Sequence, residues 1–200
     1  MTPKVFRRQL NACSGDIDLY LDSPGGDAFA GNAIYDALRQ YSAQGRGRIT
    51  AKVSLAASAA SVIAMAADEI QISIVGTIMI HDPWSALQGN ADQLRATANI
   101  LDEIRDGQIQ AYMRRTGRTR DEILTLIRGD GTYMNARTAM ELGFADSIMH
   151  AEDGDSWVQA LNEMRVCSCA ALDMDRLRAM QSKNTERDEA ARALMLRCFD

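Results

Sequence analysis

The stretch from residue 49 to residue 82 carries the most informative pattern of apolar and polar positions. Residues 49–54 have the composition of a strand, and residues 59–67 are apolar on every side, which predicts a buried helix. Two short β-rich runs follow at residues 70–75 and 77–80. The pattern therefore predicts a strand, a tight turn, a buried helix and two further strands.

The N-terminal part of the chain also alternates between helix and strand patterns. Residues 2–12 have helical spacing, whereas alternate residues of the segment 16–22 are apolar, which predicts a strand. A glycine turn at residues 23–27 leads to a helix that ends near Tyr41. Strands and helices that alternate at this spacing are typical of βαβ units, so the sequence predicts an α/β fold with a mainly parallel sheet.

Turns that follow the strands of such a sheet lie at its carboxyl edge, where ligand sites form. The glycine turn and the turn at Ser58 both follow predicted strands. We therefore expect both turns at the same edge of the sheet.

The second half of the chain begins with a long helix, predicted from about Asn90 to Arg115. Its apolar positions have near-heptad spacing with one polar break, Gln108. A helix of this length extends beyond a domain of this size, and we expect part of its apolar stripe to contact another subunit. We expect one domain over residues 1–150 and a helical, partly polar tail over residues 151–200.

Composition limits the classes of function. The chain has 200 residues, of which 46% are hydrophobic, enough for one domain with a sizeable core. The net charge of −5 gives no electrostatic support for binding nucleic acid. No apolar run reaches the ~18–20 residues of a membrane helix, and the first residues lack the apolar stretch of a signal peptide. We expect a cytoplasmic protein with no nucleic-acid or membrane partner.

The cysteines suggest neither disulfides nor a metal site. Cys13, Cys167, Cys169 and Cys198 are too few and too scattered for a disulfide framework. The pair at 167 and 169 has no second pair and no histidine partner, which argues against zinc. A reduced, intracellular setting fits this pattern, and the sequence predicts no metal and no cofactor.

Ser58 and His81 are the candidate catalytic pair. Ser58 stands in a turn of small residues at the positive end of the buried helix, beside open backbone N–H groups, and His81 follows a nearby strand. A nucleophile and its base need this arrangement. Small residues are also common in packed helices that have no catalytic role. Ser61, the rival nucleophile, lies one helical turn further on, where we expect its hydroxyl to bond a backbone carbonyl. We expect His150, the other histidine, at the surface.

Four motifs resemble, in order, those of the ClpP family of serine peptidases. They are Asp-Ser-Pro-Gly-Gly at 22–26, Ala-Ala-Ser-Ala-Ala at 56–60, Met-Ile-His-Asp-Pro at 79–83 and the segment 139–148. The resemblance covers roughly residues 16–149 and is closest to the ClpP-related head maturation (prohead) proteases of tailed phages and prophages. It implies a ClpP/crotonase-like fold with a parallel β-sheet core and a projecting handle helix.

The resemblance also assigns roles to the site residues. It implies that Ser58 is the nucleophile and His81 the general base, and that the backbone N–H groups of Gly26 and Ala59 form the oxyanion hole. Gly26 would let the backbone approach the substrate carbonyl, where a side chain would clash. Losing one oxyanion donor typically costs ~10²–10³ in rate.

The third member of the site departs from the family pattern. Counting back from Gly143, the position of the family's acid falls on Gly131, and Asp130 is one residue earlier. Either the loop is shifted by one residue and Asp130 orients His81, or the site is a dyad. Asp82 is expected to point to the opposite side of its strand and is a poor candidate.

The family also implies partners and a substrate. The turn at Pro24 and Gly25 would guide a peptide held as an extended strand, and peptide bonds would be cleaved by acyl transfer. The handle helix implies a homo-oligomer, of which a ring is one form. In a phage-infected bacterial cell or prohead, the substrates would be scaffold and capsid proteins. The chain begins at the family's first helix, without the preceding strand and pore loop, which puts coupling to an unfoldase ATPase in doubt.

The sequence leaves three alternatives open. One is a ClpP-like general peptidase; a signal-peptide-degrading form is disfavoured because no membrane segment is seen. Another is a catalytically inactive assembly or shell protein of the same fold. The third is a crotonase that acts on acyl-CoA, which would not need Ser58 and His81 together.

Overall fold

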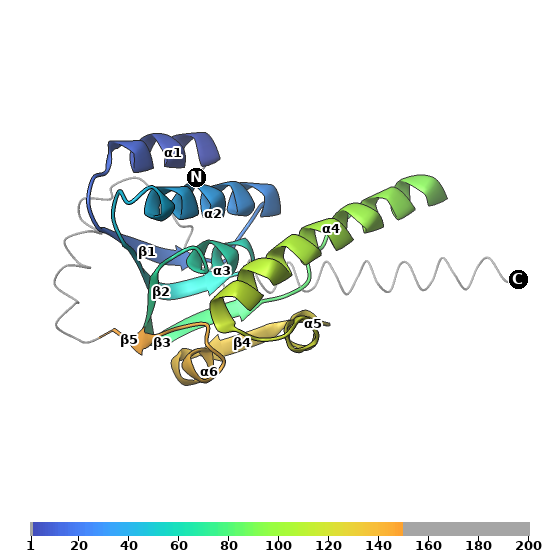
Figure 1. Ribbon diagram of the computed structural model, residues 1–200. Coiled ribbons are helices and arrows are strands. Elements are labelled where there is room, and N and C mark those ends of the chain that lie inside the picture. The colour runs from blue at the N-terminus through green and yellow to red at the C-terminus, as the bar shows by residue number, and fades with distance from the viewer. Residues whose placement is uncertain (1, 150–200) are drawn as a thin grey trace, which may run out of the picture. The chain divides into compact units, whose positions relative to one another are not determined.

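The computed structural model describes residues 2–149, so His150 and the predicted tail at residues 151–200 lie outside the described residues. Figure 1 shows the elements in chain order: α1 (Pro3–Ala12), β1 (Ile17–Ser23), α2 (Ala28–Ala43), β2 (Ile49–Ala57), α3 (Ala59–Ala64), β3 (Glu69–Ile80), α4 (Ala91–Thr116), α5 (Arg120–Ile127), β4 (Thr132–Asn135), α6 (Ala136–Glu141) and β5 (Ser147–Ile148). This order confirms the predicted mixture of helices and strands.

One five-stranded sheet forms the centre of the domain. Its strands are ordered β1-β2-β3-β4, and β5 pairs with β3. The pairs β1–β2, β2–β3 and β3–β5 are parallel, whereas β4 is antiparallel to β3. The predicted, mainly parallel sheet is therefore confirmed.

The strand register brings the glycine turn, Ser58 and His81 together. Ser23 pairs with Ala56 across β1 and β2, and Ala57 pairs with Met79 across β2 and β3. The chain leaves the sheet within a few residues of each of these pairs. The glycine turn, Ser58 and His81 therefore emerge side by side at the carboxyl edge, as expected for ligand sites in parallel sheets.

The expectation of two separate strands between residues 70 and 80 was wrong. The segment forms one strand, β3, whose register with β2 shifts between Val53 and Leu55. The shift arises because residues 73–76 are inserted into β3 as a bulge. A Cβ at Gly76 would lie 2.9 Å from the Val53 carbonyl oxygen, so glycine suits the point where the bulge rejoins the sheet.

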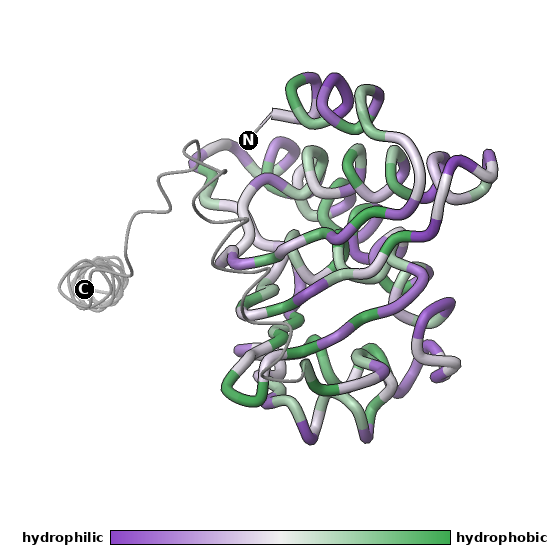
Figure 2. Tube along the Cα trace, turned by 90° about the vertical axis from the view of Figure 1, so that its left-hand side faces the viewer, coloured by the Kyte–Doolittle hydropathy of each residue, from purple (hydrophilic) through white to green (hydrophobic). Residues whose placement is uncertain are grey.

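The core lies between the sheet and the helices that pack on it. Figure 2 shows hydrophobic positions recurring along both strands and helices, with hydrophilic positions between them. The largest fully buried side chains come from α2, β2, β3, α4 and α5 and from the segments that join the elements; they include Leu38, Tyr41, Ile49, Met65, Ile72, Ile80, Ile109, Tyr112, Ile123 and Phe144.

The buried helix α3 is shorter than its apolar pattern suggested. It ends at Ala64, although Ala66 and Ala67 remain buried. The N–H groups of these two alanines donate to carbonyls three residues earlier, at Ile63 and Ala64. The chain therefore tightens into turns, which an apolar pattern alone does not distinguish from helix.

The long helix α4 projects beyond the rest of the domain (Figure 1). Its 26 residues span about 39 Å at ~1.5 Å per residue. It starts at an Asn90–Gln93 capping box and ends at Gly117, which has a φ of 70°. Its buried residues all lie in the half nearer the C-terminus, whereas Leu94 and Ile100 are exposed. No helix within residues 2–149 has the length and apolarity to cross a bilayer.

Candidate active site

Ser58 occupies a strained turn between β2 and α3. Its φ of 55° and ψ of −126° make it the only non-glycine residue with positive φ among residues 2–149. A side chain in such a conformation costs about 1–3 kcal/mol, which surrounding contacts must offset. The Ser58 N–H donates to the Met79 carbonyl at 2.9 Å, so the neighbouring strand helps to hold the turn.

His81 lies within hydrogen-bonding distance of Ser58. Its Nε2 is 2.8 Å from the Ser58 Oγ. Burial of the imidazole lowers the pKa of His81, and the negative charge of Asp82 opposes part of this shift. A lowered pKa keeps the ring neutral near pH 7, so Nε2 can accept the hydroxyl proton when Nδ1 carries the ring hydrogen. The structure therefore brings together the two residues that the sequence singled out.

The glycine turn packs directly on the Ser58 turn. Gly25 has a φ of 102°, and a Cβ there would lie 2.6 Å from both the Ala57 carbonyl oxygen and the Ser58 Cβ. At Gly26, with a φ of 149°, a Cβ would meet nothing within 4 Å. The tight contact in this turn is therefore at Gly25, while Gly26 faces open space where a substrate can approach.

Two backbone N–H groups beside Ser58 are open. Within the described part of the chain, neither the Gly26 N–H nor the Ala59 N–H has a hydrogen-bond partner. The Ser58 side chain also makes no capping bond to α3, so its Oγ remains available to His81. Two unpaired donors next to a serine–histidine pair can stabilise an oxyanion.

A cavity of 270 Å³ adjoins the pair. Ser58, Ala59, His81 and Gly26 line it, but Pro24 and Gly25 do not, and Pro24 is exposed to solvent. Most of the remaining wall is apolar and comes from α2, from the segment after His81 and from α4: Phe29, Pro83, Trp84, Ile100, Leu101 and Ile104. The cavity can therefore hold an apolar side chain beside Ser58.

The sequence did not indicate that Gln108 and these apolar side chains line one cavity. Gln108 is buried on α4 and lines the cavity, whereas the sequence pattern identifies it only as a polar break in an apolar stripe. A polar residue at a buried position of a helix is itself a signal of a functional site. Trp84, which is largely exposed, gave no comparable periodic signal.

Asp130 and His81 are not brought together. Asp130 is exposed in the turn between α5 and β4, and no hydrogen bond or ion pair of the described residues joins it to His81. The residue that does face His81 is Gly131, where a Cβ would lie 2.5 Å from the His81 Cβ. The arrangement seen is a serine–histidine dyad, and Asp130 as a third member stays a prediction.

Asp82 has a partner on α4. Its Oδ1 lies 3.9 Å from the Arg105 Nε, and its backbone N–H donates to the Ile127 carbonyl at 3.0 Å. Asp82 thus acts on His81 only through its charge. This agrees with the expectation that Asp82 does not orient the histidine.

Ser61 is held inside the domain. Its side chain is 0% exposed, and its Oγ donates to the Ser58 carbonyl at 2.6 Å. The expectation that this hydroxyl bonds a backbone carbonyl is confirmed.

No group of three or more His, Cys, Asp or Glu side chains within residues 2–149 is arranged to hold a metal ion.

Comparison with known proteins agrees with this geometry. A family model described as Clp protease matches residues 5–152. The chain belongs to the Clp protease family. Among curated Clp proteins, it is 29% identical over 136 residues to the "ATP-dependent Clp protease proteolytic subunit" of Deinococcus radiodurans, covering 67% of this chain and 65% of that one. It is 30% identical over 136 residues to "ATP-dependent Clp protease proteolytic subunit 2" of Tropheryma whipplei, covering 66% of this chain and 73% of that one.

The Clp protease match covers the whole sheet and all of the described helices except the first two residues of α1. The α/β fold with its parallel core and projecting helix is thus supported by both structure and family. The chain spans about two thirds of the length of the first Clp relative.

Proposed function

We propose that this protein is a serine endopeptidase that cleaves peptide bonds by acyl transfer through Ser58. The observation that carries the proposal is the 2.8 Å contact between Ser58 Oγ and His81 Nε2, in a strained turn beside two open N–H groups. Membership in the Clp protease family supports the same chemistry. A crotonase would have no use for this pair, since its chemistry needs no hydroxyl nucleophile with an adjacent base.

The first half of the reaction forms an acyl-enzyme. Ser58 Oγ attacks the peptide carbonyl while His81 Nε2 takes its proton. The carbonyl oxygen becomes an oxyanion, which the N–H groups of Gly26 and Ala59 stabilise. His81 then gives the proton to the leaving amine, the C–N bond breaks, and an ester to Ser58 remains.

The second half repeats these steps with water. His81 removes a proton from a water molecule, and the resulting hydroxide attacks the ester carbonyl. The same two N–H groups stabilise the second oxyanion. When the C–O bond breaks, His81 returns the proton to Ser58, and a carboxylic acid leaves.

The shape of the site supports an extended peptide with an apolar side chain beside the scissile bond. The turn at Pro24 and Gly25 would guide the peptide backbone as an added strand. The 270 Å³ cavity, walled by Phe29, Leu101 and Ile104, would take the side chain. Apolar walls of this kind favour apolar over charged residues.

The finer proposal concerns the biological substrate. The motif resemblance favours scaffold and capsid proteins processed during phage head maturation, in the bacterial host cell or the prohead. We further propose a homo-oligomer, for which a ring is one arrangement, with the exposed half of α4 at its interface. A ClpP-like general peptidase is the alternative; cleavage of cognate scaffold protein but not of an unrelated unfolded protein would separate the two.

The test of the proposed function is intact mass after exhaustive incubation with a fluorophosphonate. Wild type and Ser61→Ala should each gain one adduct, and Ser58→Ala should gain none. An adduct lost only in Ser61→Ala would move the nucleophile to that residue. A folded wild type without any adduct would contradict the proposal and favour an inactive assembly protein of the same fold.

A further inference from the structure

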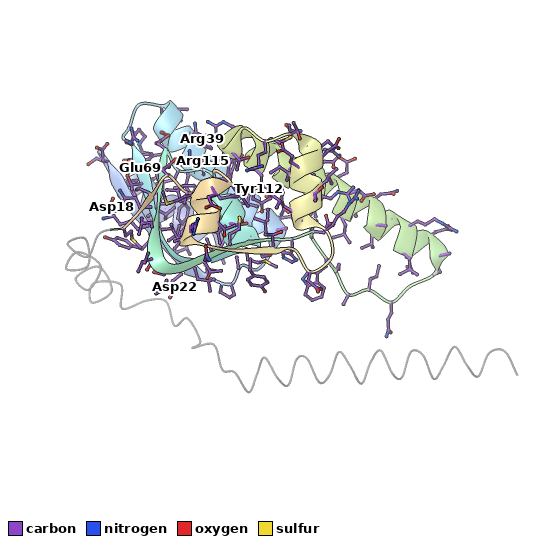
Figure 3. All side chains as sticks on the ribbon, turned by 90° about the horizontal axis from the view of Figure 1, so that it is seen from below. Asp18, Asp22, Arg39, Glu69, Tyr112 and Arg115 are labelled. Atoms are coloured by element: carbon purple, nitrogen blue, oxygen red, sulfur yellow. The ribbon has the colours of Figure 1, made fainter. Side chains whose placement is uncertain are left out.

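Ser61 and Tyr112 form a buried pair of hydroxyl groups beneath the Ser58 turn. The Ser61 Oγ lies 2.8 Å from the Tyr112 hydroxyl and 2.6 Å from the Ser58 carbonyl oxygen. The two residues are 0% and 1% exposed, so water does not compete for these bonds. Figure 3 labels Tyr112 on the inner half of α4, the half that packs on the domain.

The direction of both hydrogen bonds follows from the groups involved. A carbonyl oxygen can only accept, so the Ser61 hydroxyl gives its single proton to Ser58. The Ser61 oxygen must then accept the proton of the Tyr112 hydroxyl. Burial raises the pKa of Tyr112 well above its ordinary value, so this donor stays protonated at any working pH. The result is a fixed relay from Tyr112 through Ser61 to Ser58.

The relay acts on the peptide unit that joins Ser58 to Ala59. A trans peptide is planar, and its C=O and N–H point in opposite directions. The Ser58 C=O is held from one side by the Ser61 hydroxyl and by the Ser61 N–H at 2.9 Å. The Ala59 N–H must therefore point the other way. Ser58 and Ala59 line the cavity, whereas Ser61 and Tyr112 do not. The Ser58 C=O therefore points away from the cavity, and the Ala59 N–H points toward it.

From this geometry we infer that Ser61 and Tyr112 are positioning residues that aim the Ala59 N–H at the oxyanion. The inference rests on the proposed function, because it assigns the oxyanion to the cavity beside Ser58. The relay also helps to stabilise the positive φ of Ser58, since a strained backbone conformation persists only where surrounding contacts stabilise it. Because Tyr112 belongs to α4, the relay also links the inner end of the projecting helix to the site.

Single-atom variants test the inference. Tyr112→Phe removes the first donor and Ser61→Ala the second, while Ser61→Thr keeps a hydroxyl at the same place. Tyr41→Phe is the matched control, because Tyr41 is equally buried and its hydroxyl donates to the Gly15 carbonyl, which belongs to neither the cavity nor the relay. The measurements are kcat and KM for a fluorogenic peptide amide with leucine before the scissile bond, the rate of fluorophosphonate labelling, and the melting temperature.

We expect kcat and the labelling rate to fall about tenfold in Tyr112→Phe and about 10- to 100-fold in Ser61→Ala, since misaiming a donor loses part of the ~10²–10³ that it supplies. KM should change little, and Ser61→Thr should recover most of the loss. The double variant should be no slower than Ser61→Ala, because Tyr112 acts only through Ser61. Tyr41→Phe should lower the melting temperature and leave kcat unchanged.

Wild-type values of kcat and labelling rate in both Tyr112→Phe and Ser61→Ala would overturn the inference, even with lower melting temperatures. So would an equal loss of kcat in Tyr41→Phe. If Ser61→Ala does not fold, Tyr112→Phe, which lacks one oxygen, carries the test alone. Failure of the proposed function looks different, since the wild type itself would then take no label on Ser58.

Discussion

Gly131 lies directly against His81: a Cβ at position 131 would fall 2.5 Å from the His81 Cβ and 2.3 Å from the Ile80 carbonyl oxygen. The turn between α5 and β4 thus meets the proposed base at a residue that has no side chain. Its neighbour Asp130 is exposed. The next two predictions concern this turn.

Gly131→Ala should destabilise the fold more than Gly129→Ala. Both glycines have a positive φ, of 76° and 64°, so alanine is strained at either position. Only at Gly131 would the new Cβ also collide with the end of β3, whereas at Gly129 it would meet nothing within 4 Å. We expect a loss of about 1 kcal/mol at Gly129 and of ~2–3 kcal/mol or more at Gly131. Urea unfolding of the two variants measures this difference, and equal losses would contradict the contact.

Asp130→Asn should leave most of the activity in place. Asp130 makes no hydrogen bond with His81, so we expect kcat to fall by less than about threefold rather than by the ~10⁴ that follows loss of a triad carboxylate. The measurement is kcat for the same leucine peptide amide, with Asp121→Asn on the exposed surface of α5 as a control. A large loss confined to Asp130→Asn would instead establish a triad in which the turn moves when substrate binds.

The rate of fluorophosphonate labelling should rise with pH around a midpoint below 6.5. Burial lowers the pKa of His81 from its ordinary value of 6.5, so the neutral, basic form persists to lower pH than in a free histidine. The Asp82 charge raises the pKa, so Asp82→Asn should move the midpoint lower still. A midpoint above 6.5, or one that rises in Asp82→Asn, would contradict this account.

The same shift affects stability. A folded-state pKa below the unfolded value means that the unfolded chain binds the proton more readily. The contribution of His81 to the free energy of unfolding should therefore be constant above pH 6.5 and fall as the pH drops below it. Comparison of wild type with His81→Gln by urea unfolding at several pH values isolates this contribution.

Leu101→Asp should change which peptides are cleaved. Leu101 lines the apolar wall of the cavity, and a carboxylate there would have to be desolvated against a leucine side chain of the substrate. We expect kcat/KM for a leucine peptide to fall more than about tenfold, and less for a peptide with lysine at that position. Met140→Asp, at an exposed apolar position of α6 outside the cavity, is the control and should leave the ratio unchanged.

Local patterns in the sequence were sufficient for most of the fold. Alternating apolar residues predicted β1, and the near-heptad spacing from about residue 90 to 115 predicted α4, because each pattern reports which face of one element meets the core. The same reasoning misjudged β3 and the end of α3. A bulge and a run of tight turns keep an apolar composition, so they differ from regular structure only in their hydrogen bonds.

The sequence by itself also determined which serine and which histidine to consider, since Ser58 stands in a turn of small residues after one predicted strand and His81 follows another. Only the tertiary structure decided how the other groups meet them. Ser61 and Tyr112 are 51 positions apart, and His81 meets Gly131 rather than Asp130. These contacts depend on how α4 and the turn before β4 pack against the sheet. Close packing between elements distant in sequence sets such contacts, whereas a motif reports only its own local geometry.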